Sequence, residues 1–247
     1  MSLIFSDSYP IRVHEINQRN QLSISGLLGI LQDSAWGSAK SLGASVEQMH
    51  AWGIAWVLTR MKTTIHRLPE LGEKVQVETW PSGTNRSFVY RDYRMWDEAG
   101  NCIVESTSTW LVLNMETRKM TSPQESLGPI LQFPDDRTHL ERATGRIPAL
   151  SEATHSLQAE VKWLDVDVNR HTNNRSYLNW IWDSIPADWL SKHEIGEIDL
   201  IFKTESDLGD HLQILTEQES TETFLHTIKK SDSKISIHAR TYWRSIP

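Results

Sequence analysis

Residues 165–186 read DVDVNRHTNNRSYLNWIWDSIP, and this stretch decides the fold prediction for the chain. Its first part alternates valines with four polar residues: Asp165, Asp167, Asn169 and His171. Side chains repeat every two residues in an extended segment, so the four polar groups are expected on one side of a strand or extended loop. Val166 and Val168 are then expected on the other, inward side.

A helix pattern follows directly. Asn173 or Asn174 offers an N-cap, because an Asn side chain can accept a hydrogen bond from an amide of the first turn. Large apolar residues then recur at helical spacing up to Ser184: Tyr177, Leu178, Trp180, Ile181 and Trp182. The polar row is therefore expected at the positive end of a mostly buried helix, which suits the polarisation of a carbonyl group.

The stretch that begins at Asp165 matches only the first part of a calcium-binding loop. Asp165, Asp167 and Asn169 occupy the first three ligand positions of an EF-hand. Arg170 stands where the sharp turn needs Gly, and Ser176 stands where a bidentate Glu is required. The sequence therefore predicts no metal site here.

Composition limits the classes of function. The chain has 247 residues, 38% hydrophobic and 23% charged, as ordinary globular proteins have. A net charge of −7 argues against general nucleic-acid binding, and an acidic partner would need a local basic patch. The one cysteine, Cys102, excludes an intrachain disulfide or a cysteine zinc site.

Neither the start of the chain nor its apolar runs indicate a membrane or secreted protein. The N-terminal letters MSLIFSDSYPIRVHEI lack a basic start followed by an apolar core, so no signal peptide is predicted. No run approaches the roughly 18 apolar residues of a membrane span. We therefore expect a cytoplasmic protein without stable membrane insertion.

Hydrophobic periodicity predicts the same order of elements twice, strand, helix and four strands. In the first half we expect a strand at 9–16, a helix from Ser23 or Ser25 to about Leu42, a short helix at 45–51, and strands at 54–66, 74–81, 87–96 and 102–114. Residues 115–152 are expected to form a surface linker with a short helix near 137–143. In the second half we expect strands at 154–163, 197–203, 211–217, 223–230 and 233–243 around the helix described above.

Repeated letters support the two halves. LGEKVQVET starting at Leu71 resembles LGDHLQILT starting at Leu208, and LLGILQDS ending at Ser34 resembles YLNWIWDS ending at Ser184. We therefore predict an α+β protein of two units, each with a long central helix wrapped by an antiparallel sheet. The expected bounds are 1–125 for the first unit, 126–152 for the linker and 153–247 for the second unit.

This combination resembles the double hotdog of the acyl-acyl carrier protein thioesterases. The run from Asp165 to Pro186 is similar to the family's D-x-D-x-N-x-H-x-N-N-x-x-Y-x-x-W-I-x-x-S-x-P pattern, and LIFKTESDLGD is similar to the family's strand with a catalytic Glu. IRVHEINQRNQLSISGLLGILQDSA and WVLTRM add weaker support from the first half. The resemblance implies a tandem double hotdog whose first unit holds the acyl chain and whose second unit holds the catalytic residues.

The resemblance also implies a catalytic set: Asp167, Asn169, His171 and Glu205. Plant members have Cys where this chain has Ser206, and Cys102 lies in the other half, so we expect water attack assisted by a carboxylate. Glu205 is the expected base and Asn169 orients water or the carbonyl. His171 shares the proton or protonates the departing sulfur, and Asp167 holds Asn169 or His171.

Further residues are expected to bind the substrate. The resemblance places the acyl pocket in the first half, where the candidates are Leu27, Leu31, Trp56, Leu58 and Met61; ordinary core packing is the alternative for each. Backbone amides at the helix start, at Asn173 and Asn174, are the expected oxyanion donors. Basic residues that an acidic carrier protein could contact are Arg60, Lys62, Arg137, Arg142 and Arg146, although such residues are more often simply solvated.

The expected function is hydrolysis of fatty acyl-acyl carrier protein to free fatty acid and carrier thiol. The alternatives are an acyl-coenzyme A thioesterase, a hotdog dehydratase and an acyl-binding module without catalysis, since fold alone does not fix function. The chemistry requires no cofactor or metal. A monomer and a homodimer are both compatible with the sequence.

Overall fold

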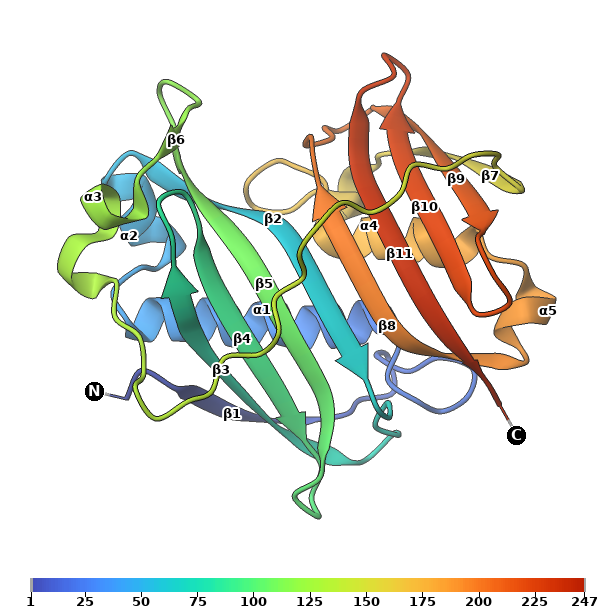
Figure 1. The fold of residues 1–247 in the computed structure, drawn as a ribbon, viewed down its shortest axis with the longest axis horizontal. Helices are drawn as coiled ribbons and strands as arrows, with labels where there is room; N and C mark the ends of the chain where they lie inside the picture. The colour runs from blue at the N-terminus through green and yellow to red at the C-terminus, as the bar shows by residue number, and fades with distance from the viewer. Residues whose placement is uncertain (1, 247) are drawn as a thin grey trace. The chain divides into compact units, whose positions relative to one another are not determined.

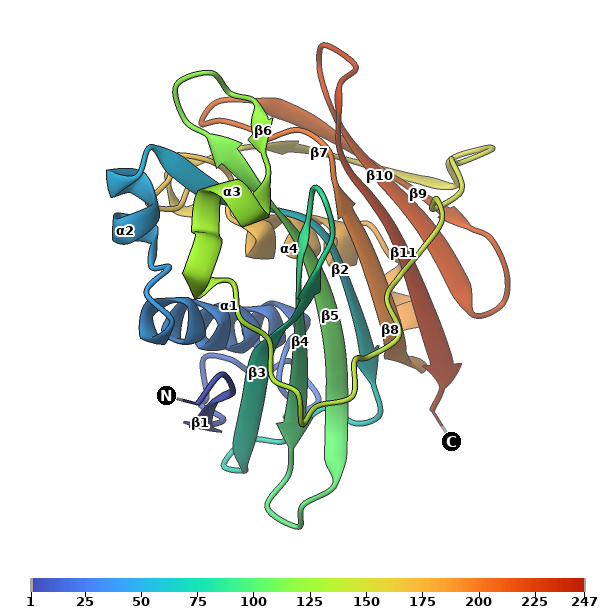
Figure 2. The same cartoon turned by 60° about the vertical axis from the view of Figure 1, so that its left-hand side comes forward.

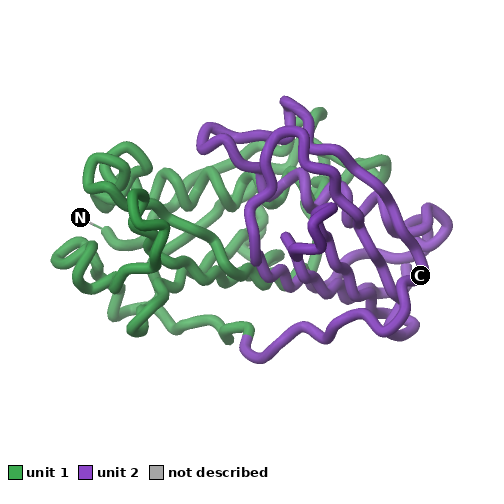
Figure 3. Tube along the Cα trace, turned by 90° about the horizontal axis from the view of Figure 1, so that it is seen from above, with its two compact units in different colours: residues 1–143 green, residues 144–247 purple. Residues whose placement is uncertain are grey.

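The structure of the protein is a computed structural model that describes residues 2–246. It divides into two units, Met1–Ala143 and Thr144–Pro247, coloured separately in Figure 3. Each unit consists of one antiparallel sheet and one principal helix. Among the described residues, no helix is both long and apolar enough to cross a bilayer.

The first unit has a sheet in the order β1-β3-β4-β5-β2, with β6 paired to β5. Its strands are β1 (Phe5–Pro10), β2 (Ile54–Ile65), β3 (Lys74–Thr84), β4 (Val89–Trp96), β5 (Cys102–Asn114) and β6 (Met120–Thr121). The helices are α1 (Ile24–Ser41), α2 (Val46–Ala51) and α3 (Pro123–Leu127), followed by the 3-10 turn η1 (Gly128–Ile130). Figure 1 shows α1 lying against one face of this sheet.

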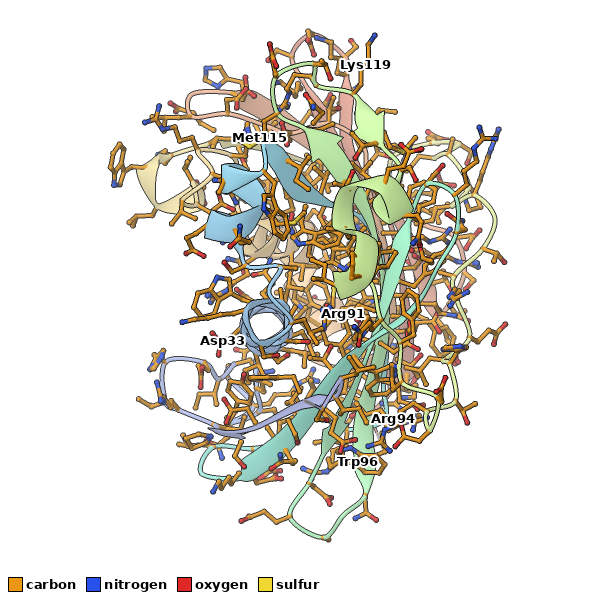
Figure 4. The ribbon with its side chains drawn as sticks, turned by 90° about the vertical axis from the view of Figure 1, so that its left-hand side faces the viewer. Asp33, Arg91, Arg94, Trp96, Met115 and Lys119 are labelled. Carbon is orange, nitrogen blue, oxygen red and sulfur yellow. The ribbon has the colours of Figure 1, made fainter. Side chains whose placement is uncertain are left out.

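Helix α1 begins where its cap predicts. The Ser23 hydroxyl accepts a hydrogen bond from the Gly26 amide at 3.0 Å, as expected of a Ser N-cap. Leu27 and Leu31 are buried, whereas Asp33 is exposed and points away from the sheet (Figure 4). Arg91 extends from β4 towards the helix, where its Nη1 donates to Ser38 Oγ at 2.9 Å. The strand expected at residues 9–16 has the wrong bounds, because β1 begins at Phe5, ends at Pro10 and is followed by a loop.

The part of the linker that belongs to the first unit, residues 131–143, runs along the face of its sheet opposite α1 (Figures 1 and 2). Arg137 pairs with Glu78 at 3.2 Å, and the Leu140 amide donates to Asp92 Oδ2 at 2.9 Å. Arg142 donates to the Ser82 carbonyl at 2.8 Å. The helix expected near 137–143 is wrong, because these contacts to the sheet hold the segment without helical structure. They also give Arg137 and Arg142 a structural role.

The second unit repeats the plan with the sheet order β8-β11-β10-β9-β7. Its strands are β7 (His155–Glu160), β8 (His193–Phe202), β9 (His211–Gln218), β10 (Thr223–Lys230) and β11 (Ile235–Ser245). Its helices are α4 (Asn174–Asp183) and α5 (Ala187–Leu190), and the 3-10 turn η2 spans Trp163–Asp165. Helix α4 contacts β7 and β9, and its 10 residues make it shorter than the 18 of α1.

A hydrogen-bonded chain crosses the core of the second unit. The Ser184 hydroxyl donates to the Ile181 carbonyl at 2.7 Å, so it accepts from Thr216 at 2.6 Å. The Thr216 oxygen must then accept from Nδ1 of His226 at 2.8 Å, and Nε2 accepts from the Thr241 hydroxyl at 3.0 Å. His226 is fully buried, and burial lowers its pKa from 6.5 to about 3. It is therefore a neutral structural histidine.

Candidate active site

The polar stretch before α4 is a folded loop rather than an extended segment. The Asp167 amide bonds to the His171 carbonyl at 3.0 Å, and Arg170 has the left-handed φ of 67° that lets the chain reverse. The expected two-sided alternation is therefore wrong, and Val168 is 92% exposed instead of inward. The reason is local: Asp and Asn side chains that bond nearby amides favour turns over strands.

The two aspartates of this loop, Asp165 and Asp167, accept hydrogen bonds from its backbone amides. Asp165 Oδ2 accepts the Lys162 amide at 2.9 Å, and Asp167 Oδ1 accepts the Asn169 amide at 2.8 Å. Asp167 thus holds the backbone of Asn169, one of the two roles expected for it, while its own amide holds the backbone of His171. The Asn169 side chain is exposed at the turn.

A second segment is tied to the loop through Thr172. Its amide and its hydroxyl both donate to the Ser206 carbonyl, at 2.9 and 2.7 Å. Ser206 itself is fully buried and bonds to Ser236 Oγ at 2.9 Å. These bonds fix residues 205–207 beside the loop, although they lie more than thirty positions away in the sequence.

His171 lies between two carboxylates as a result. Its Nε2 is 3.4 Å from Glu205 Oε2, and its Nδ1 is 3.0 Å from Asp207 Oδ1. The ring is about one-third exposed, so solvent and a substrate can reach it. The expected pair of His171 and Glu205 is brought together, whereas Asp207 was not anticipated. The spacing Glu205-x-Asp207 in an extended segment was the signal that could have found it, since alternate residues share a side.

At the start of α4 the Asn173 amide donates to the Asp165 carbonyl at 2.7 Å, so the expectation that it is an oxyanion donor is wrong, and Asn174 is the remaining candidate. Asn173 is the N-cap, and its side chain accepts the Arg175 amide at 2.9 Å. Asn174 is the first residue of the helix. The positive end of the helix dipole therefore lies two to three residues beyond His171, a suitable environment for a developing negative charge.

The expected acyl-pocket residues lie inside the first unit. Four are buried, on α1 and β2: Leu27, Leu31, Leu58 and Met61. Trp56 is half-buried, donates from Nε1 to the Ala44 carbonyl at 3.3 Å, and packs against the cluster around Met49. Their part in binding an acyl chain stays a prediction.

Two other kinds of catalytic group are a bound metal ion and a cysteine nucleophile. Within residues 2–246 there is no group of three or more His, Cys, Asp or Glu side chains arranged to hold a metal ion. Cys102 is a half-buried free thiol on β5 of the first unit. Burial raises the pKa of this thiol, which lowers its thiolate fraction and its nucleophilicity.

Two units, each with an antiparallel sheet against one principal helix, define a tandem hotdog protein, and the histidine between two carboxylates is its candidate active site. The family model for the acyl-acyl carrier protein (ACP) thioesterase N-terminal domain matches residues 2–128 of the sequence. The family model for the C-terminal domain matches residues 149–245. The chain therefore belongs to the acyl-ACP thioesterase family.

Curated relatives come from plant chloroplasts. The chain is 30% identical over 264 residues to a palmitoyl-ACP thioesterase of Gossypium hirsutum, covering 98% of this chain and 64% of that protein. It is 26% identical over 285 residues to oleoyl-ACP thioesterase 1 of Arabidopsis thaliana, covering 99% of this chain and 77% of the relative. The chain thus spans less than two thirds of the length of the cotton protein.

Solved structures share the fold along the whole chain. An acyl-ACP thioesterase from Bacteroides thetaiotaomicron aligns with a TM-score of 0.90 at 23% identity, covering 99% of this chain and 100% of that one. The 12:0-ACP thioesterase from Umbellularia californica aligns with a TM-score of 0.85 at 23% identity, covering 100% and 99%. The tandem double hotdog predicted from the sequence is confirmed.

Proposed function

We propose that the protein hydrolyses fatty acyl-ACP thioesters and releases free fatty acid and the carrier thiol. Membership of the acyl-ACP thioesterase family supports the reaction class. The observation that carries the mechanism is the 3.4 Å contact between His171 Nε2 and Glu205 Oε2 at a partly exposed site.

The proton count assigns roles to the three side chains. A neutral imidazole has one N–H, so it can donate to only one of the two carboxylates. With that proton on Nδ1, donated to Asp207 at 3.0 Å, the Nε2 lone pair faces Glu205. Glu205 then acts as the base: it takes a proton from water, and its new O–H is positioned to donate to Nε2.

The reaction balances through this pair. The hydroxide oxygen bonds to the thioester carbon while Glu205 holds the proton. The tetrahedral intermediate collapses, the C–S bond breaks, and the proton passes from the Glu205–His171 pair to the departing sulfur. A thiol with a pKa near 8.5 is a good leaving group, so protonation of sulfur can be late. In this proposal the side-chain amide of Asn169 and the backbone amide of Asn174, in the first turn of α4, donate to the carbonyl oxygen.

Ser206 takes no part in this scheme. It stands where plant members have Cys, but it is buried and bonded to Ser236, and its carbonyl holds Thr172. Water is therefore the nucleophile that the site supports best. The acyl chain is proposed to bind in the first unit, along Leu27, Leu31, Trp56, Leu58 and Met61.

Location and assembly belong to the same proposal. The free thiol of Cys102 is consistent with a reducing compartment, and we place the enzyme in the cytoplasm, without stable membrane insertion. Fractionation of the source cells checks this placement. A monomer and a homodimer are both compatible with the proposed reaction, and sedimentation equilibrium distinguishes them.

The test is hydrolysis by Glu205→Gln, with thiol release followed on matched acyl-ACP and acyl-coenzyme A substrates. Loss of a positioned base predicts a fall in kcat of at least about a hundredfold. The control is Glu160→Gln, because Glu160 is an exposed carboxylate at the end of β7. Near-normal turnover by Glu205→Gln would contradict its role as base. A preference for coenzyme A esters, double-bond formation in hydroxyacyl chains, or binding without thiol release would favour the corresponding alternative.

A further inference from the structure

Three large apolar side chains project from the loop in front of His171. Trp163 is 79% exposed, Leu164 is 94% exposed and Val168 is 92% exposed. Trp163 and Leu164 lie in the 3-10 turn η2, and Val168 lies in the turn closed by the bond from the Arg170 amide to the Asp167 carbonyl at 3.0 Å. Apolar side chains gathered on a surface commonly mark an interaction site.

These side chains are not needed to fold the loop. The first unit has a loop with the same backbone bonds, 150 positions earlier: Asn17 N to Gln21 O corresponds to Asp167 N to His171 O. The three matching positions there hold Val13, His14 and Gln18. Since that loop forms without a Trp or a Leu, the apolar surface of the second loop serves something other than its fold.

The exposed charged side chains within this segment are both basic. Lys162 and Arg170 are exposed at the two ends of the segment. The acids between them, Asp165 and Asp167, are half-buried, and each directs a carboxylate oxygen to a loop amide. The loop therefore presents apolar groups between two exposed basic side chains, while its two acids are turned to the backbone and the chain as a whole carries −7. Such a surface fits an acidic protein with apolar contact residues.

We propose that Trp163, Leu164 and Val168, flanked by Lys162 and Arg170, form the docking surface for the acidic carrier protein that delivers the thioester. This inference rests on the proposed function, because it assigns the carrier to the surface beside the catalytic histidine. Val168 is three residues from His171, so a carrier on this surface holds the flexible arm that bears its thioester next to the ring.

The test compares one acyl group on two carriers. The triple variant Trp163→Ser, Leu164→Ser, Val168→Ser is assayed with acyl-ACP and with the same acyl chain on pantetheine, which lacks the protein. We expect kcat/KM for acyl-ACP to fall by about tenfold or more through KM, as loss of an interface anchor does. Hydrolysis of acyl-pantetheine should stay within about twofold, because no residue of the catalytic set is changed. Val13→Ser, at the equivalent place in the first unit, is the matched control and should alter neither substrate.

Two further measurements keep the inference open to refutation. Arg170→Glu should lower kcat/KM for acyl-ACP at low salt, with a smaller loss at high salt. Equal losses on both substrates, or no loss on acyl-ACP, would overturn the docking surface. A dimer that the triple variant converts to a monomer would assign the surface to a second copy instead. Failure of the unmodified enzyme to hydrolyse either substrate would overturn the proposed function. Calorimetric binding of carrier protein, lost in the triple variant and kept in Val13→Ser, would still support docking.

Discussion

The loop before α1 and the loop before α4 have one backbone design and different side chains. Ser23 N bonds to Glu15 O at 2.7 Å, and Asn173 N bonds to Asp165 O at 2.7 Å. Leu22 N bonds to Pro69 O at 2.7 Å, as Thr172 N bonds to Ser206 O at 2.9 Å, so residues 68–70 correspond to residues 205–207.

The chemistry differs at three corresponding positions. The first unit has Gln21 where the second has His171, Leu68 where it has Glu205, and Glu70 where it has Asp207. Leu68 is 9% exposed and belongs to the core, so it contributes apolar packing where the second unit contributes a base. The shared framework brings two segments together in both units, and the acid–base chemistry depends on the side chains placed on it.

The largest expected effect on turnover comes from replacing His171 by Gln, the residue that the first unit has at this position. His171→Gln should lower kcat by about a thousandfold, because an amide cannot accept and return a proton as imidazole does. The loop should stay folded, since Gln21 occupies the same framework in the first unit. Thiol release and circular dichroism measure the two outcomes. Gln21→His is the reciprocal control, and a fall in activity there would contradict the assignment of catalysis to the second loop.

The next largest effect is expected from acid pH, which should destabilise the second unit but not the corresponding position of the first. His226 is matched in the first unit by Tyr93, whose hydroxyl bonds to Ser108 at 3.3 Å. The folded-state pKa of His226 is about 3 against 6.5 when unfolded, so the unfolded chain binds the proton first and stability falls as pH drops from about 6.5 towards 3. At pH 4.5 this amounts to about 3 kcal/mol of unfolding free energy. Urea unfolding at pH 7 and pH 4.5 measures it.

The matched variant for this acid effect is His226→Gln, which retains an amide donor and acceptor. It should remove most of the extra loss of stability between pH 6.5 and pH 4.5 while lowering stability at pH 7. Burial raises the pKa of Tyr93, so the corresponding position of the first unit stays uncharged throughout this range. An unchanged pH dependence in His226→Gln would place the acid sensitivity elsewhere.

The smallest effect is expected at the orienting carboxylate. Asp207→Ala should lower kcat by about tenfold with KM little changed, because His171 Nδ1 loses the acceptor at 3.0 Å that sets its tautomer. Asp207→Asn, which keeps an oxygen acceptor, should lose less. Glu70→Ala in the first unit is the control and should keep full kcat. Equal losses in Asp207→Ala and Asp207→Asn would show that the charge, rather than the acceptor, is what counts.

Much of the fold was readable because its elements follow simple patterns. Ser23, Ser45 and Asn173 begin helices as their cap chemistry predicts, and the strands from 54 to 114 follow alternation and turn residues. Helix α3 was missed although Ser122 followed by Pro123 and Glu125 is a start signal. The helix expected near 137–143 failed because contacts with distant strands override local propensity.

The site was readable in its residue types and less so in its geometry. The pairing of His171 with Glu205 followed from the family pattern, because that pattern records which distant residues meet. The reversal at Arg170 was not predicted, since a left-handed non-glycine residue leaves little trace in hydrophobic periodicity. Misreading that turn also placed Val168 inward, and so concealed the exposed apolar surface beside His171.

The bonds of the linker restrict where the gene can change in length. Leu140 and Arg142 are anchored to the sheet of the first unit, and the Ser151 amide bonds to Glu217 Oε2 at 2.6 Å in the second. An inserted codon before Arg142 would shift these anchors out of step with Asp92 and Ser82, whereas one between Arg142 and Ser151 leaves both sets of anchors in register. Ile147 in that interval is buried, so insertions and deletions among descendants of this gene should accumulate between Arg142 and Ser151 on either side of Ile147.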